Sequence, residues 1–400
     1  MASRPPDALA PPPGNPRFPL LDPLRAVAAL CIVVTHTAGW SGFNAAHALG
    51  AWTARLDCGV AIFFVLSGFL LYRPFVAARL DGRDRPRVAR YARRRALRIL
   101  PAYWTALIAV AVLMPRDAPG VFGPHWWAYF GLLQSWSSAT ILGGLGVAWS
   151  LSVEAAFYVL LPFYALGMAR LLRGRTRDGQ ARVELAFLAV TAVLAAGSRT
   201  VMHVADPGSP YLNTLPGTWA WFCGGLSLAV LSAWGSQHLR LARDHAYAFW
   251  AAAFGFLTVA AWGAGLPRVL GEPYRTAPLA AEHVLYLGIA VCLVAPATVR
   301  DRMPLLRARP LVWLGLVSYG IFLYHQPFVG RLLAIRDHSP VAGYVWYTLA
   351  VAAAAIACAA VSYYLVERPL LRFKEPQRAR GTGGSSARAR SRALAAKPES

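Results

Sequence analysis

The sequence has few charged residues and few cysteines for its length. Only 14% of the 400 residues are charged, whereas 57% are hydrophobic, a balance that soluble domains of this length do not show. The five cysteines lie far apart, with neither a CxxC pair nor a His/Cys cluster. The sequence therefore predicts no metal site and no disulfide framework.

Acidic residues are also scarce. Asp and Glu number 18 against 40 Lys and Arg, so the formal charge is +22. This positive charge does not indicate nucleic-acid binding, because the basic residues form short clusters between long apolar runs. Such clusters are typical of loops beside a membrane. We therefore expect a lipid bilayer, and no nucleic acid, as a partner of this chain.

Ten apolar stretches are long enough to cross a bilayer as helices, which takes about 17–25 residues. They are residues 20–40, 57–77, 96–114, 148–172, 184–203, 214–234, 245–265, 279–298, 311–333 and 341–366. A shorter aromatic segment, residues 125–136, is expected to lie in the membrane interface or to re-enter the membrane. The predicted fold class is all-α, a polytopic transmembrane helical bundle with about ten spans.

The arginines provide an independent check, because positive loops stay on the cytoplasmic side. With the N-terminus inside, the dense clusters at 73–98, 170–182, 240–243 and 300–309, and the basic tail from 368, all fall inside. Both termini are therefore predicted to be cytoplasmic, in a multi-pass protein of the plasma membrane. Residues 1–18 and 375–400 are predicted to be disordered segments on either side of a transmembrane domain at 19–374.

Ionisable residues inside a bilayer are costly, so they mark candidate functional sites. The first span carries Asp22, Arg25 and His36. Eleven residues, close to three helical turns, separate Arg25 from His36, which places both on one face about 16 Å apart. An interfacial ion pair and a hydrogen-bonded core histidine would also account for these residues. A polar stripe along an apolar helix nevertheless favours a functional role.

Polar groups also occur near the outer ends of two other spans. Ser152 and Glu154 lie in the fourth span, where Glu154 is either a structural partner for an arginine or a general acid/base. In the ninth span, His325 lies two turns from Ser318 on one face. It is predicted to reach a depth similar to that of His36.

Two further segments have a structural and a functional interpretation. In the second span, Ser67 and Gly68 permit close helix packing. At the start of the third span, Arg95 and Arg98 lie one turn apart. Their positive charge either sets the orientation of the chain in the membrane or provides two guanidinium groups that can bind the phosphates of a donor.

These segments together resemble the acyltransferase-3 family, bacterial membrane O-acyltransferases that modify exported or surface carbohydrates and some antibiotics. The resemblance covers about residues 19–374, in family order. Its motifs are LDGLRAxAxxxVxxxH at 21–36, FFxLSGFLL at 63–71, RRxxRIxPxYW at 94–104, WSLSVExxFY at 149–158, SYGIYLxHxP at 318–327 and VERPxxR at 366–372. The chain departs from the family at Pro23, where Gly is usual, and at Ala155 and Ala156, which leave Glu154 as the only carboxylate of its motif.

The resemblance implies an activity. It implies transfer of an acyl group, with acetyl as the expected group, from acyl-CoA to a hydroxyl of a carbohydrate or glycosylated acceptor. Acyl-CoA is then a co-substrate, and no permanently bound cofactor is expected. The implied family motifs are RX10H at Arg25 and His36, RXXR at Arg95 and Arg98, and SXE at Ser152 and Glu154.

Roles follow from the chemistry of acyl transfer, which needs a base for the hydroxyl proton and donors for the tetrahedral oxyanion. We expect a neutral His36 to be the base and His325 to be a second donor to the oxyanion. Glu154 would orient His36 or bind acceptor hydroxyls. The donor phosphates are assigned to Arg25, Arg95 and Arg98, and supporting roles to Asp22, Ser67, Ser152 and Ser318.

Two alternatives remain open from the sequence. An acyl-enzyme on Ser152 or His36 is conceivable, although no nucleophile elbow or triad spacing supports it. The polar stripe would also suit the permeation path of a transporter or flippase. The lack of internal repeats counts against that function.

The predicted topology can be tested with a protease added to intact cells. We expect both ends of the chain to resist digestion from the outer face and to become sensitive in inside-out vesicles, because the dense arginine clusters hold these ends inside. Digestion of either end from outside would contradict the topology.

Overall fold

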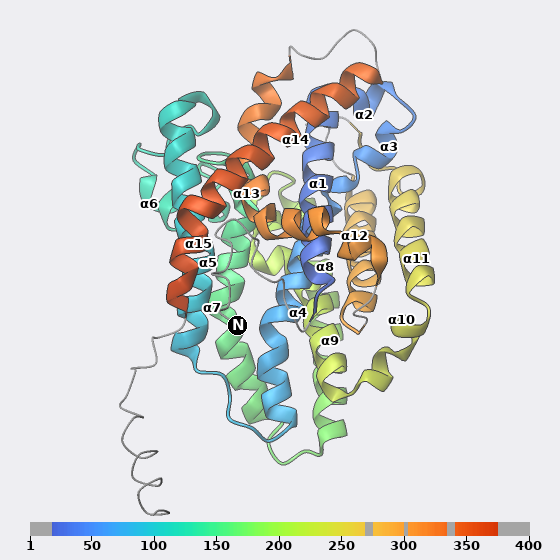
Figure 1. Cartoon of the computed structure of the whole chain (residues 1–400). Coiled ribbons are helices and arrows are strands. Elements are labelled where there is room, and N and C mark those ends of the chain that lie inside the picture. Colours follow the sequence, from blue (N-terminus) through green and yellow to red (C-terminus); the bar gives the residue numbers. More distant parts are fainter. Residues whose placement is uncertain (1–17, 269–274, 300–302, 334–340, 375–400) are drawn as a thin grey trace, which may run out of the picture.

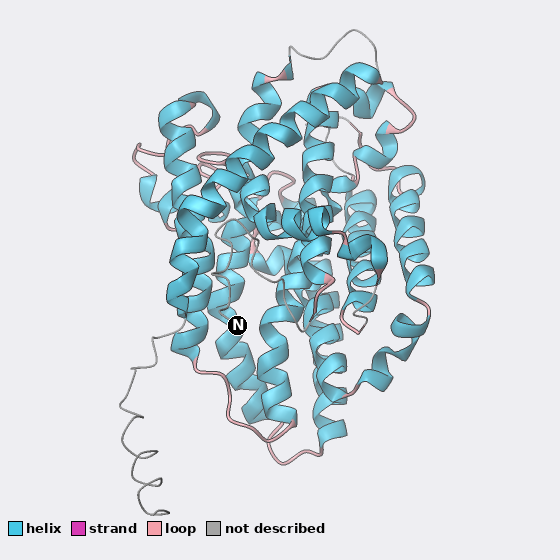
Figure 2. Ribbon diagram, in the orientation of Figure 1, coloured by secondary structure: helices cyan, strands magenta, loops and turns pink. Residues whose placement is uncertain are grey.

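The computed structural model describes residues 18–268, 275–299, 303–333 and 341–374. These residues form helices and turns with no strand (Figures 1 and 2). The predicted all-α helical bundle is therefore confirmed. The segments 1–17 and 375–400, predicted to be disordered cytoplasmic ends, lie outside the described residues.

Ten helices correspond one to one with the ten predicted spans. They are α1 (Leu21–Trp40), α4 (Gly59–Leu80), α5 (Val88–Leu113), α7 (Trp149–Leu171), α8 (Arg177–Ala205), α9 (Leu215–Trp234), α11 (Ala246–Thr258), α12 (Thr276–Ala297), α13 (Arg309–Arg331) and α14 (Ala342–Ser362). Two of them continue into a π-helical turn, α11 into η7 (Val259–Gly263) and α14 into η10 (Tyr363–Glu367).

Short helices make up the connections. They are α2 (Phe43–Ala46), α3 (Gly50–Thr53), α6 (Trp126–Phe130), α10 (Arg240–Asp244) and α15 (Arg368–Leu371). The aromatic segment 125–136 contains α6 and the 3₁₀ turn η3 (Gln134–Trp136), both too short to span a bilayer. Trp126 and Trp127 are exposed, whereas Tyr129 and Gln134 are buried. One face of this segment therefore packs against the bundle, and the other face is exposed on its surface.

Eight helical segments among the described residues are long and apolar enough to cross a membrane, and they contain eight of the ten predicted spans. The other two are α9 and α13. Both are rich in small or polar residues that are buried against neighbouring helices, such as Gly225 and Thr218 in α9 and Ser318 and Gly320 in α13. Helices packed inside a bundle need less hydrophobic surface than helices that face lipid.

The helix α5 begins earlier than the sequence predicted. The sequence predicts a third span from residue 96, but the helix starts at Val88, after the extended Arg87. Arg and Ala are strong helix formers, so the basic run continues the helix instead of leading up to it. Arg95 and Arg98 therefore lie two turns or more inside α5.

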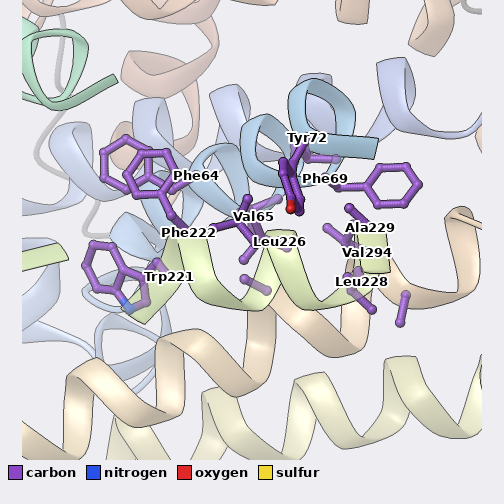
Figure 3. Close-up of a cluster of buried hydrophobic side chains, with 14 of the residues drawn as sticks. Phe64, Val65, Phe69, Tyr72, Trp221, Phe222, Leu226, Leu228, Ala229 and Val294 are labelled. Carbon is purple, nitrogen blue, oxygen red and sulfur yellow. The ribbon is translucent and has the colours of Figure 1, made fainter. Parts of the chain in front are cut away.

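The main hydrophobic core lies between α4 and α9 (Figure 3). The Phe64 ring stacks on Phe222 at a centroid distance of 4.6 Å. The two backbones meet where Gly68 faces Gly225, so that a Cβ added at Gly225 would lie 2.8 Å from the backbone nitrogen of Phe69. Small residues permit this approach, which increases the van der Waals contact that drives helix association in lipid.

The helix α1 runs through the middle of the bundle and packs against α13, α4 and α14 (Figure 1). Its closest backbone approach is to α13, where a Cβ added at Gly315 would overlap the carbonyl group of Asp22. The polar stripe of α1 therefore faces other helices and not the lipid. This position brings Arg25 and His36 into contact with residues from distant parts of the chain.

Arginines of two of the basic segments meet at one end of the bundle, where Arg83 and Arg177 both bind Asp81. Arg177, at the start of α8, bonds to the Asp81 carboxylate at 3.0 Å and to the Ala233 carbonyl at 2.8 Å. The end of α4, the start of α8 and the end of α9 therefore lie on the same side, as the alternating topology requires. At the opposite side of the bundle, Arg331 at the end of α13 forms an ion pair of 2.7 Å with Asp117, which lies in the turn after α5.

Replacing Gly225 with Ala tests the contact between α4 and α9. We expect Gly225→Ala to lower the stability of the bundle by about 1–3 kcal/mol, because the new methyl group collides with the backbone of α4. Gly167→Ala in α7 is the matched control, since nothing lies within 4 Å of a Cβ there. It should be neutral or stabilise the helix by up to about 1 kcal/mol. Thermal unfolding of both proteins in detergent gives the comparison, and equal melting temperatures would contradict the close packing.

Candidate active site

Two histidines from distant parts of the chain form a hydrogen-bonded pair. His36 on α1 and His325 on α13 lie 2.8 Å apart between Nδ1 of His36 and Nε2 of His325. Their rings are nearly parallel, with an interplanar angle of 15° and centroids 5.1 Å apart. His325 is fully buried, and His36 is half-buried. The predicted similar depth of the two residues is confirmed.

The hydrogen-bond network determines the tautomers of neutral imidazoles at this pair. Nδ1 of His325 lies 2.8 Å from the Phe322 carbonyl oxygen and 3.2 Å from that of Ile321. A carbonyl only accepts, so Nδ1 carries the proton and Nε2 of His325 accepts from Nδ1 of His36. Nε2 of His36 is then unprotonated, and no described residue hydrogen-bonds to it. This nitrogen is therefore able to accept a proton.

A cavity of about 90 Å³, lined by charged, polar and apolar side chains, lies between α1, α4, α5, α7 and α13, on the Arg25 side of the pair. Six of the predicted site residues line it: Arg25, Ser67, Arg95, Arg98, Glu154 and Ser318. We call it the inner cavity. Residues that are 293 positions apart in the sequence thus share one site, which supports the grouping made from the motifs.

Glu154 is held in this cavity by a residue of another helix. The Ser67 hydroxyl on α4 donates a hydrogen bond to the carboxylate of Glu154 on α7. Ser67 had been expected to permit helix packing, and Gly68 beside it does so. The serine additionally fixes the position of the carboxylate. Tyr158, one turn along α7, lines the same cavity.

The three predicted donor arginines have different surroundings. Arg25 pairs with Asp22 at 2.8 Å, and Arg98 pairs with Glu367 at 3.6 Å. Arg95 lines the inner cavity and also a larger groove outside it. All three arginines line the inner cavity, and Asp22 and Glu367 partly neutralise Arg25 and Arg98.

Two supporting residues lie at different distances from this site. Ser318 lines the inner cavity and donates to the Gly315 carbonyl at 2.8 Å. Ser152 instead points to the loop before α7, where its hydroxyl bonds to Ser135 at 2.7 Å in a buried position. Successive residues on a helix are about 100° apart, so Ser152 and Glu154 face different directions. The structure does not bring Ser152 to the inner cavity.

Aromatic side chains separate the inner cavity from the histidine pair. Phe63 and Phe322 line the cavity and contact each other edge to face, with centroids 6.2 Å apart. The Phe322 ring also lies 6.0 Å from that of His325. A molecule that reaches from the arginines to His36 therefore passes these two rings.

Sequence reasoning missed Glu367 as a site residue. Its carboxylate is 2% exposed and approaches Arg98 from the π-helical turn after α14. A buried carboxylate beside the membrane surface was a usable signal, because such a group needs a cationic partner. Tyr319 was missed as well; it lines the cavity and bonds to the Ile99 carbonyl at 3.1 Å.

A comparison with family models matches residues 19–364 to an acyltransferase domain. The chain belongs to the acyltransferase-3 family. It is therefore a multi-pass protein of the plasma membrane and an acyltransferase, and the alternative of a transporter or flippase is disfavoured. No solved structure matches the chain.

Several curated proteins are similar over most of this chain. It is 26% identical over 379 residues to nodulation protein 10 of Rhizobium leguminosarum bv. viciae, covering 88% of this chain and 93% of that protein. It is 28% identical over 389 residues to the acyltransferase MdmB of Streptomyces mycarofaciens, covering 90% and 94%. The peptidoglycan O-acetyltransferase OatA of Listeria monocytogenes is 22% identical over 370 residues, and the chain spans 55% of its length.

The ion pair of Arg98 with Glu367 leads to a prediction about stability. Arg98→Ala removes a partner of a buried carboxylate and should destabilise the bundle by about 1–3 kcal/mol. This is less than a fully buried pair would cost, because 23% of the Arg98 side chain is exposed and water screens the charge. Adding Glu367→Gln should restore part of the loss. A double-mutant cycle on thermal stability measures the coupling, and strictly additive effects would exclude the pair.

Proposed function

We propose that this chain is an acyl-CoA-dependent O-acyltransferase that transfers a short acyl group, acetyl in the simplest case, to a hydroxyl of a saccharide or glycosylated small molecule. The observation that carries the proposal is the His36–His325 pair next to a cavity with three arginines. The pair supplies a proton acceptor, and the arginines supply a site for a phosphorylated donor.

His36 is the general base in this proposal. Its Nε2 takes the proton of the acceptor hydroxyl as the hydroxyl oxygen attacks the thioester carbonyl. A tetrahedral intermediate forms, the carbon–sulfur bond breaks, and the proton passes from His36 to the departing thiolate. Hydroxyl and thioester become ester and thiol, so the step needs no further reactant and no acyl-enzyme.

His325 has an orienting role in this mechanism. Its Nδ1–H is committed to backbone carbonyls, and its Nε2 accepts from His36. It therefore holds His36 in the tautomer that exposes the basic nitrogen, much as a carboxylate holds the histidine of a catalytic triad. This arrangement favours an orienting residue over the oxyanion donor expected from the sequence.

Arg25, Arg95 and Arg98 would bind the donor phosphates at the cytoplasmic end of the inner cavity. Arg25 and His36 are separated by eleven helical residues, a rise of about 16 Å. An extended pantetheine arm is of that order, so a thioester anchored at the arginines can reach His36. The arm would then lie among Ser67, Ser318 and Glu154, whose polar groups can satisfy its amides.

The acceptor is proposed from the family and from the relatives. OatA is named for peptidoglycan, and the chain spans about half of that protein. MdmB is an acyltransferase that the chain covers almost completely. A hydroxyl on a cell-envelope glycan or on a glycosylated small molecule fits both, and it would reach His36 from the outer side. Glu154 would bind acceptor hydroxyls or donor amides.

Substitution of His36 tests the proposal. We expect His36→Ala and His36→Gln both to insert and to bind the donor, yet to lose about 10²–10⁴-fold in acyl transfer, because neither side chain accepts a proton. His245→Gln, at an exposed histidine outside the site, is the matched control and should keep full activity. Acyl transfer and thermal stability are measured on the same purified proteins.

The outcomes separate the general base from a packing histidine. If His36 only packs, Ala should lower the stability and Gln should largely restore both stability and activity. An active His36→Gln enzyme would therefore end the general-base assignment.

A further inference from the structure

A second cavity, of about 770 Å³, lies between α4, α5 and α7. We call it the outer groove. Its walls are the C-terminal part of α4, the first turns of α5 and the middle of α7. Apolar side chains line most of it, including Val88, Ala92, Ala96 and Phe163. This volume is within the range of about 300–1,000 Å³ that is typical of ligand sites.

The outer groove and the inner cavity meet. Arg95, Ile99 and Tyr158 line both of them. The two spaces therefore adjoin at these three side chains. An elongated ligand could occupy both spaces with its middle at Arg95.

The opposite end of the outer groove is also positively charged. Arg79, Arg83 and Arg85 line it there, and Asp84 is the acidic residue among its lining residues. Arg79 is fixed in the wall by the buried Glu184, and Arg83 bonds to Asp81 at 2.7 Å. Arg83 and Arg85 are exposed, so their charges are accessible at the mouth. The groove thus has Arg83 and Arg85 at one end and Arg95 at the other.

We propose that the outer groove binds the nucleotide part of the acyl donor, with the 3′-phosphate of coenzyme A at Arg83 and Arg85 and the diphosphate at Arg95. This inference rests on the proposed function. Coenzyme A carries its 3′-phosphate and its 5′-diphosphate on one ribose, from which the adenine projects. Long arginine side chains from the two ends of the groove would bind the two phosphorylated positions, and the apolar wall between them would receive the adenine. The inner cavity is then left for pantetheine.

A phospholipid is the competing occupant, because Val159 and Phe163 on the groove wall are exposed on the surface of the bundle. A phospholipid, however, has one phosphorylated headgroup and would occupy only one of the two arginine-bearing ends, whereas coenzyme A has a phosphorylated position for each. The charge distribution therefore favours the nucleotide.

Truncated donors test the assignment by calorimetry on the purified full-length protein at fixed salt. We expect dephospho-coenzyme A, which lacks the 3′-phosphate, to bind about tenfold more weakly than coenzyme A. 4′-Phosphopantetheine, which lacks the whole adenosine part, should bind more weakly still. Arg83→Ala with Arg85→Ala should remove the difference between coenzyme A and dephospho-coenzyme A without changing the affinity for 4′-phosphopantetheine.

A second variant fills the groove. Ala92 and Ala96 are exposed on α5 and line the groove, so Ala92→Phe with Ala96→Phe adds bulk without entering the packed core. This variant should bind coenzyme A as weakly as wild type binds 4′-phosphopantetheine. Ala89→Phe, at an exposed position of the same helix outside the groove lining, is the matched control and should bind like wild type.

The outcomes distinguish this inference from the proposed function. Equal wild-type affinities for the three donors, or a filled groove that still discriminates among them, would overturn the nucleotide site and leave an acyl-CoA enzyme in place. Phospholipid that copurifies with wild type but not with the filled variant, together with such equal affinities, would assign the groove to lipid. Failure of wild type to bind any of the three donors would refute the donor itself.

Discussion

The close packing of α1 against α13 is the contact on which the candidate site depends. The approach of Gly315 to the Asp22 carbonyl brings the two helices together at one end. The 2.8 Å hydrogen bond between His36 and His325 joins them further along. A fully buried imidazole such as that of His325 needs a partner for each of its nitrogens. The carbonyl oxygens of Ile321 and Phe322 and the ring of His36 provide these partners, and Nε2 of the half-buried His36 is left available for chemistry.

The same requirement explains the other charges inside the bundle. Lipid provides no hydrogen bonds, so an ionisable group in a span needs a partner within the protein. Arg79 pairs with Glu184, and Arg55 pairs with Glu282 at 2.9 Å. These pairs join helices and do not line the inner cavity. An intramembrane charge is therefore a candidate for function only when a cavity reaches it, as one does at Arg95.

The functional proposals form one path through the molecule. In these proposals a donor would enter on the cytoplasmic side, would be held by arginines of α1 and α5, and would present its thioester to His36 past Phe63 and Phe322, which line the inner cavity. His325 is fully buried in the bundle, and this burial strengthens the electrostatic interactions at the pair. Membership of the acyltransferase-3 family and the geometry of the site agree on acyl transfer.

The sequence by itself determined the helical class, the approximate positions of the ten long helices and six of the residues that line the inner cavity, because hydropathy and spacing are local properties. It did not determine where α5 begins, since strongly helix-forming arginines extend an apolar helix without a change in hydropathy. Only the tertiary structure decided that His325 meets His36, that Ser67 holds Glu154 and that Glu367 pairs with Arg98. These contacts join residues from 87 to 289 positions apart. They depend on which helices pack together, and no periodicity within a single helix carries that information.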